Sequence, residues 1–285
     1  MSGKLADVGR RIASVRQLGA VVNAMRGIAG ARAQQGRALL PGIRAYADTA
    51  RRAIGLARHL DGIAAKEADD PGRSKPGLIV FGAEQGFAGP FAELVLDTTQ
   101  AQFGSSHVFL IGSRTAGLAA ERNLEADWET RLPNGAAGIT ETAILIIDAL
   151  YDYLAEAGAV PVELLYPLWT PGEGVSILRR SLLPFDPLVI AVEHRDIPPL
   201  TNLPPPALIE RLAQEYIFAQ ICEAAAEAFA AENEARAATM AAAKTNIDSK
   251  LAALELEERL TRQEEITAEV VELAAGTKSR QHARA

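Results

Sequence analysis

Both ends of this 285-residue chain have the composition of long helices, and the two ends carry opposite charge. Residues 1–60 contain eleven Lys or Arg and two Asp or Glu, whereas residues 232–272 contain five Lys or Arg and ten Asp or Glu. Each exposed pair of opposite charges contributes only about 0.3–0.5 kcal/mol, so such charges select a pairing more than they stabilise it. We therefore predict that the termini fold back on each other as one antiparallel coiled coil, which favours a mechanical or scaffolding role over catalysis.

Apolar residues in the first segment, residues 1–60, recur at steps of three and four, the spacing of a coiled-coil seam. The first run consists of Leu5, Val8, Ile12, Val15, Gly19 and Val22. We expect the seam to resume at Leu39, Ile43, Tyr46, Ala50, Ala53, Ala57 and Leu60.

Three glycines, Gly27, Gly30 and Gly36, lie between these two runs. A glycine inside a helix costs about 1 kcal/mol relative to alanine, so we expect another backbone to approach closely there. The dipeptide Pro41-Gly42 should kink or interrupt the helix.

A second long helix is predicted at the other end, within residues 201–276, beginning near Ala207 and ending near Ala275. Its seam is expected at Leu208, Leu212, Ala219, Cys222, Ala226, Phe229, Met240, Lys244, Ile247, Leu251, Leu254, Ile266, Val270 and Leu273. At about 1.5 Å per residue this helix would be roughly 100 Å long, which is too long to be buried inside a domain of this mass. A basic tail, residues 277–285, follows it.

The middle of the chain, residues 77–200, has the mixed pattern of an α/β domain. Strands are predicted at Leu78–Phe81, His107–Ile111, Val162–Trp169 and Val175–Leu183, and helices at Phe91–Phe103, Arg114–Arg122 and Thr142–Ala157. Strands that alternate with helices indicate a parallel sheet, and the last two strands read as a hairpin. A polar linker, residues 61–76, precedes this domain, and a proline-rich connector, residues 186–206, follows it.

Composition excludes several classes of function. The net charge of −7 gives no general attraction to nucleic acid, and we expect no membrane span because no apolar run approaches about 20 residues. The four histidines have no metal-ligand spacing. The glycine-rich turn Gly82–Gly89 follows a strand as a phosphate loop does, but it matches no nucleotide-binding motif. We expect no catalytic, cofactor or metal site; an α/β ligand-binding module using this turn and a structural coiled-coil adaptor remain the alternatives.

Two motifs in the last helix carry a family resemblance. Residues 232–246, ENEARAATMAAAKTN, resemble the stretch S-E-x-A-A-R-M-x-A-M-x-x-A-T-x-N of the γ subunit of F-type rotary ATPases. Residues 262–276, RQEEITAEVVELAAG, resemble that family's R-Q-x-x-I-T-x-E-L-x-E-I-x-x-G. Near the other end, Arg11–Val15 and Asn23–Arg32 look like its R-I-x-S-V and x-A-M-x-M-V-A-A-x-K segments.

The resemblance implies a rod of N- and C-terminal helices with a Rossmann-like α/β domain at its base. It implies a non-catalytic rotor inside an α3β3 hexamer, with an ε-type subunit and a membrane c-ring as further partners. The complex would lie on the cytoplasmic, inner face of the cell membrane. By resemblance, Arg262, Gln263 and Thr267 contact the catch loop of β, whereas Met25, Val270 and Leu273 belong to the seam or touch the surrounding sleeve.

The chain also departs from the family pattern. Glu264 and Glu265 stand where small residues are usual, and Gly27 replaces the second methionine of the N-terminal motif. These departures suggest a divergent branch, and coupling to Na⁺ instead of H⁺ is a hypothesis that the chain itself does not settle.

Overall fold

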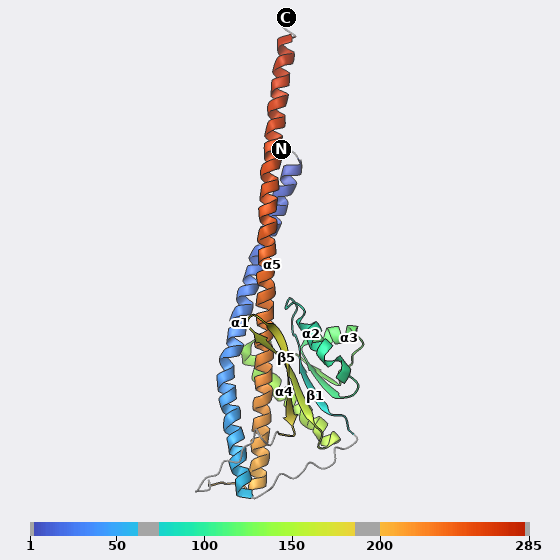
Figure 1. Ribbon diagram of the computed structural model, residues 1–285, viewed down its shortest axis with the longest axis vertical. Coiled ribbons are helices and arrows are strands. Elements are labelled where there is room, and N and C mark those ends of the chain that lie inside the picture. The colour runs from blue at the N-terminus through green and yellow to red at the C-terminus, as the bar shows by residue number, and fades with distance from the viewer. Residues whose placement is uncertain (1–2, 62–73, 186–199, 283–285) are drawn as a thin grey trace. The chain divides into compact units, whose positions relative to one another are not determined.

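The structure is a computed structural model, and it describes residues 3–61, 74–185 and 200–282, with side chains for residues 3–58, 74–185 and 200–271 (Figure 1). The long helices α1 (Gly3–Asp61) and α5 (Pro205–His282) stand at the two ends of the sequence, with a sheet domain between them. The chain forms two compact units, one of residues 29–237 and one of residues 1–28 with 238–285. Most of the expected linker and connector lies outside the described residues.

The unit of residues 29–237 contains a five-stranded sheet in the order β3-β2-β1-β4-β5. Its strands are β1 (Gly77–Phe81), β2 (His107–Ile111), β3 (Trp128–Thr130), β4 (Val162–Thr170) and β5 (Gly174–Leu183). The first four are parallel, and β5 pairs antiparallel with β4 through the expected hairpin turn. The predicted parallel sheet and hairpin are confirmed, whereas the short strand β3 was not predicted.

Helices cover both faces of this sheet (Figure 1). Residues alternate between the faces along each strand, as a pleated backbone requires. Ile79 and Phe81 of β1 pack with α4 (Ile139–Ala157), α1 and α5, whereas Leu78 and Val80 pack with α2 (Phe91–Thr99) and α3 (Ser113–Glu121). Short 3-10 turns, η1 (Gln100–Gln102) and η2 (Ala136–Gly138), complete the connections. The core is therefore a three-layer α/β arrangement, with part of α5 built into one layer.

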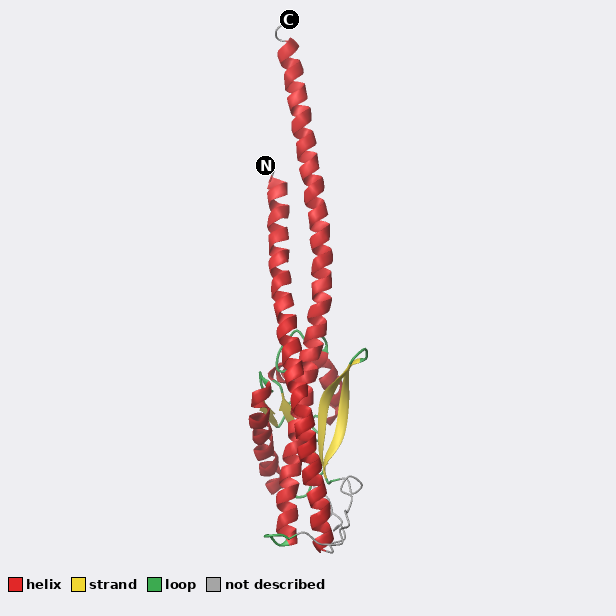
Figure 2. Cartoon of the chain, turned by 90° about the vertical axis from the view of Figure 1, so that its left-hand side faces the viewer, coloured by secondary structure: helices red, strands yellow, loops and turns green. Residues whose placement is uncertain are grey.

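Within the same unit, α1 and α5 lie side by side (Figure 2). The predicted α1 seam is confirmed at Ala50 and Ala57, but it lies one residue later than predicted near Leu39 and Tyr46. The buried positions on the 3-4 repeat are Ala29, Ala33, Gly36, Leu40, Ala47, Ala50, Ile54 and Ala57, and Gly55 beside them is also buried. The predicted seam residues Leu39 and Tyr46 are 39% and 45% exposed. The observed positions continue the 3-4 frame of Val8 and Ile12 without a break, so the regular repeat, not the size of the apolar side chain, sets the seam.

Helix α1 also runs through Pro41 without interruption. Among the three mid-helix glycines, Gly36 has the close neighbours expected of it, because a Cβ atom there would lie 2.9 Å from Cδ1 of Phe229. Gly27 and Gly30 do not: no described atom of another element lies within 4 Å of their Cβ positions.

The second unit, described by itself, is an antiparallel pair made of the start of α1 and the later part of α5. Val8, Ile12 and Leu254 form its buried cluster, with Val15 and Leu251 packed against it. An ion pair between the two helices joins Lys4 to Glu264. Ile266 and Val270 lie beyond it along α5 and are 55% and 59% exposed.

Candidate functional site on helix α5

Cross-helix ion pairs in the unit of residues 1–28 and 238–285 join basic residues of α1 to acidic residues of α5. Arg16 donates to Glu255 at 2.7 Å, and Lys4 and Arg11 lie 3.8 and 4.0 Å from Glu264 and Glu257. These side chains are largely exposed, so each pair contributes little energy. Arg10, by contrast, pairs with Asp7 of its own helix.

The same complementarity holds in the unit of residues 29–237. Arg37 lies 2.9 Å from Glu234, and Arg44 bridges Glu223 at 2.8 Å and Glu227 at 2.5 Å. The prediction that the basic and acidic ends align lengthwise is therefore confirmed inside each unit.

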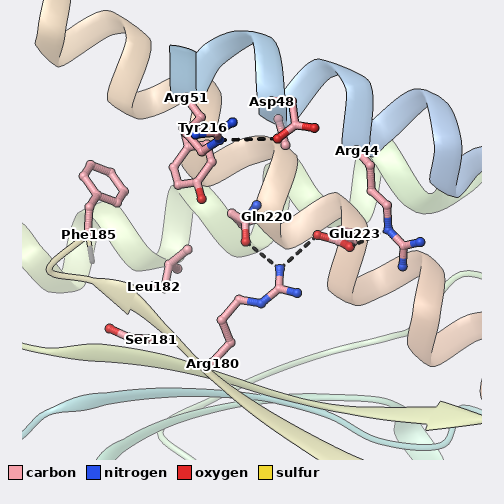
Figure 3. Close-up of a pocket in the computed structure, with 11 residues that line it drawn as sticks. Arg44, Asp48, Arg51, Arg180, Ser181, Leu182, Phe185, Tyr216, Gln220 and Glu223 are labelled. Atoms are coloured by element: carbon pink, nitrogen blue, oxygen red, sulfur yellow. Dashed lines mark hydrogen bonds and ion pairs between the residues drawn. The ribbon is translucent and has the colours of Figure 1, made fainter. Parts of the chain in front are cut away.

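Glu223 is the centre of a polar network that joins three elements (Figure 3). It accepts hydrogen bonds from Arg44 of α1 at 2.8 Å and from Arg180 of β5 at 2.9 Å, and Arg180 also donates to Gln220 at 2.6 Å. Burial alone would raise the pKa of Glu223, but the two guanidinium groups together outweigh it and lower that pKa below its ordinary value. The carboxylate is thus held ionised where α1, α5 and the sheet meet.

A cavity of about 510 Å³ opens beside this network. Its wall includes Arg44, Arg51, Arg180, Phe185 and Tyr216. Each of the three arginines already pairs with a carboxylate of the chain, since Arg51 lies 3.3 Å from Asp48. The cavity therefore lacks the excess positive charge that an anion site needs.

The residues expected to contact a partner lie on one exposed stretch of α5. Arg262, Gln263 and Thr267 are all exposed and fall within about 140° of arc around the helix. Arg262 donates to Glu258 at 3.0 Å, and Thr267 Oγ1 donates to the Gln263 carbonyl at 2.8 Å. The amide of Gln263 and part of the Arg262 fork are thus presented outward.

The expected seam or sleeve residues are less uniform. Met25 is half-buried in α1 and Val270 is exposed on α5. The side chain of Leu273 lies outside those that the structure describes. A contact of these three residues with a sleeve therefore stays a prediction.

The glycine-rich turn after β1 is occupied by the chain itself. The Glu232 carboxylate of α5 accepts the backbone N–H groups of Glu84 and Gln85 at 3.1 and 2.9 Å. Arg236 donates to the carbonyls of Gly86 and Gln85 at 3.1 and 3.3 Å. Because a phosphate would need those N–H groups, the geometry does not favour the nucleotide-binding alternative. Sequence reasoning missed this clamp: the spacing of Glu232 and Arg236, one helical turn apart, indicates an ion pair within α5 but not the loop that the pair binds.

Within the described residues, no group of three or more His, Cys, Asp or Glu could hold a metal ion. None of the described helices has a stretch apolar and long enough to cross a bilayer.

Comparison with known proteins matches a family model described as ATP synthase to residues 4–279, nearly the whole chain. The chain belongs to the ATP synthase gamma-chain family. An ATP synthase gamma chain of Geobacter metallireducens is 25% identical over 285 residues, covering 96% of this chain and 98% of the relative. One from Thermobifida fusca is 25% identical over 296 residues, covering 97% and 96%. The resemblance read from the two α5 motifs is thus confirmed over the full length.

The fold is also similar to that of chains in solved ATP synthase structures. The rotor of the Euglena gracilis mitochondrial ATP synthase superposes with a TM-score of 0.64 at 14% identity, covering 93% of this gamma chain and 99% of that chain. A chain of the central stalk and c-ring structure from Tetrahymena thermophila gives a TM-score of 0.53 at 13% identity, covering 78% and 99%. Long helices at both ends and a mixed sheet between them are the fold of ATP synthase central stalks.

Proposed function

We propose that this gamma chain is the rotor of an ATP synthase, in which α1 and α5 form a shaft that turns inside an α3β3 hexamer. The shaft couples ion flow through a membrane c-ring to ATP synthesis or hydrolysis at the β subunits. The observation that carries the proposal is the antiparallel pairing of α1 with α5, which has the same register in both units. Paired helices resist bending and twisting, as a shaft must.

The chain performs this role without catalysing a reaction. Each angle of an asymmetric shaft touches the three β subunits differently, and a difference in contact energy is what shifts a conformational equilibrium. The chain's own part is therefore to present unlike surfaces around its axis.

The contacts that would discriminate between β subunits are Arg262, Gln263 and Thr267. The exposed donors of Arg262 and Gln263 and the hydroxyl oxygen of Thr267 can bond one β subunit at a time, whereas Met25, Val270 and Leu273 offer apolar surface that slides. An ε-type subunit and the c-ring are the further partners that we propose, and the complex would lie on the cytoplasmic face of the cell membrane.

The test is reconstitution of the ATPase complex with and without this chain. With the wild-type chain, α3β3 and the membrane part should hydrolyse ATP and pump ions together, and the free chain should show little ATPase activity. Measuring in the same assay whether H⁺ or Na⁺ is pumped identifies the coupling ion. The proposal fails if the chain does not bind α3β3, or if coupled pumping is unchanged when it is omitted.

The contact assignment is tested by Arg262→Ala and Gln263→Ala in that complex. Both should lower the coupled ATPase rate without unfolding the chain, because the side chains are exposed. Lys250→Ala is the matched control, since it removes an exposed charge of the same helix outside the contact segment. Equal effects of Lys250→Ala and Arg262→Ala would contradict the assignment.

A further inference from the structure

We propose that Glu232 and Arg236 are positioning residues that lock the sheet domain to α5, so that the domain and the shaft turn as one body. The inference rests on the proposed rotor function. It adds the contact through which torque passes between the sheet domain and α5. Every residue that it uses lies in the unit of residues 29–237.

The clamp consists of hydrogen bonds from α5 to the backbone of one loop. Glu232 accepts two N–H groups, from Glu84 and Gln85, and Arg236 donates to two carbonyls, of Gln85 and Gly86. Arg236 also pairs with Glu232 and donates to Asn233 Oδ1 at 3.0 Å. Backbone contacts of this kind hold the position of the loop whatever its side chains are.

Burial makes this clamp stiffer than the other ion pairs of the chain. The side chains of Glu232 and Arg236 are 3% and 7% exposed, whereas in every other described ion pair at least one of the two side chains is 34% exposed or more. Water competes weakly for such groups, and a buried charge left without its partner is costly. The clamp therefore resists both sliding and rotation of α5 against the loop.

The loop in turn holds the carboxyl edge of the sheet together. The Glu84 carboxylate accepts the backbone N–H of Ser113 at 2.9 Å and that of Leu132 at 3.0 Å. Ser113 begins α3 after β2, and Leu132 follows β3. A continuous chain of hydrogen bonds thus leads from α5 to the segments after three parallel strands.

Apolar packing alone would not provide such a lock. Alanines of α5, including Ala231 and Ala235, fill the space against the sheet. Hydrophobic contact is non-directional, so these alanines by themselves do not fix the rotational position of α5 against the loop. Directional hydrogen bonds at Glu232 and Arg236 fix the rotational position of the helix.

The experiment uses the reconstituted complex carrying Glu232→Gln or, as the milder change, Arg236→Lys. Two readouts are taken: hydrogen exchange of the Glu84 and Gln85 amides, and ions pumped per ATP hydrolysed. The control is Asp248→Asn, which breaks an ion pair of the same i,i+4 spacing on α5 whose side chains are 32% and 55% exposed.

We expect exchange at Glu84 and Gln85 to rise about 100-fold in Glu232→Gln, with a smaller rise in Arg236→Lys and none in Asp248→Asn. Pumping per ATP should fall in the same order while hydrolysis continues. If Glu232→Gln does not fold, the test rests on Arg236→Lys alone. This variant keeps the positive charge and loses only the planar guanidinium group with its paired N–H donors.

Two results overturn the lock: exchange that stays at the wild-type rate in both variants, or exchange that rises while pumping per ATP is unchanged. Both leave the rotor function standing, because that function is judged by the wild-type chain against the complex without it. A wild-type chain that confers no coupled activity rejects the proposed function itself.

Discussion

Arg44 of α1 donates from Nε to Glu223 of α5 at 2.8 Å, although 179 residues separate them in the sequence. In each cross-helix ion pair that is described, the two residue numbers add to between 267 and 271; these pairs are Lys4–Glu264, Arg11–Glu257, Arg16–Glu255, Arg37–Glu234, Arg44–Glu223 and Arg44–Glu227. One antiparallel register therefore holds in both units. A slip of α5 by one heptad would separate all of these charges together, so their collective effect is to specify the register.

Removing the Glu223 carboxylate should destabilise the isolated chain. Glu223→Gln leaves Arg44 and Arg180 with a weaker acceptor, and we expect a loss of about 2 kcal/mol in the free energy of unfolding at pH 7. Urea unfolding measures it. Glu163→Gln is the control, because Glu163 pairs with Arg179 at a more exposed place and should cost less than about 1 kcal/mol. Similar losses in the two variants would contradict the central place of Glu223.

The same network makes stability depend on pH. The folded-state pKa of Glu223 is lowered from 4.5, so its stabilisation is complete above pH 4.5 and is lost as the pH falls through the folded-state value. The difference in unfolding free energy between wild type and Glu223→Gln should therefore shrink as the pH is lowered below 4.5. Burial raises the pKa of Glu227, and the nearby Glu223 charge adds to that rise, so the comparison is made in a Glu227→Gln background in which this group cannot titrate. A difference that grows with acidity would refute the assignment.

The exposed pair of Arg16 and Glu255 should show coupling in a double-mutant cycle. Arg16→Glu and Glu255→Arg each place like charges together, whereas the double variant restores an opposite pair. We expect a coupling energy of about 0.5 kcal/mol that falls as salt is added. Arg10→Glu is the control, because Arg10 pairs with Asp7 of its own helix and should not couple to Glu255. Coupling of equal size at Arg10 would mean that the effect is only one of net charge.

Local sequence patterns predict the strands and helices of this fold better than they predict the contacts between those elements. The strands β1 and β2 match the expected bounds to within one residue. A short apolar run between turn residues is typical of a buried strand, so its limits can be read from the sequence. The strand β3 has three residues and no fully buried side chain, so it leaves no such run. The seam was placed one residue early at Leu39, which is indistinguishable by size from Leu40, and at Tyr46, which is a larger apolar group than Ala47. Tyr46 instead reaches Glu215 with its hydroxyl.

The candidate site divides in the same way. The segment holding Arg262, Gln263 and Thr267 is predicted from a motif alone, because its side chains face outward and core packing imposes no apolar periodicity on them. The clamp of Glu232 and Arg236 was missed, since its partners are backbone atoms 147 to 151 residues away. A backbone amide has no sequence signature, so only the three-dimensional arrangement shows what a buried carboxylate binds.

Replacement of Phe87 should raise the stability of the isolated chain. It has a φ of 64°, the left-handed region that bulky residues avoid, and its side chain is 69% exposed. Asparagine adopts this conformation more easily, and little buried surface is lost, so Phe87→Asn should raise the free energy of unfolding by about 0.5–1 kcal/mol. Thermal unfolding would detect this as a higher Tm. A lower Tm would show that the ring packs against the chain in solution.

The mid-helix glycines of α1 should respond to alanine with opposite signs. At Gly36 a Cβ atom would lie 2.9 Å from Cδ1 of Phe229, which is buried, and 3.4 Å from the Ala226 carbonyl. Neither neighbour can retreat easily, so Gly36→Ala should cost about 1–3 kcal/mol. At Gly27 and Gly30 the corresponding space is open among the described residues, and alanine should add about 0.5–1 kcal/mol by restricting the unfolded chain.

Urea unfolding of the three single variants under one set of conditions checks this contrast. Intrinsic helix propensity favours alanine equally at all three positions, so it serves as an internal reference. A stabilising Gly36→Ala would show that the two helices separate there, contrary to the packing on Phe229. Destabilisation by Gly27→Ala or Gly30→Ala would show that a close neighbour is present in solution, as expected from the sequence. With opposite signs, close helix contact accounts for Gly36 alone, and no described neighbour accounts for the glycines at positions 27 and 30.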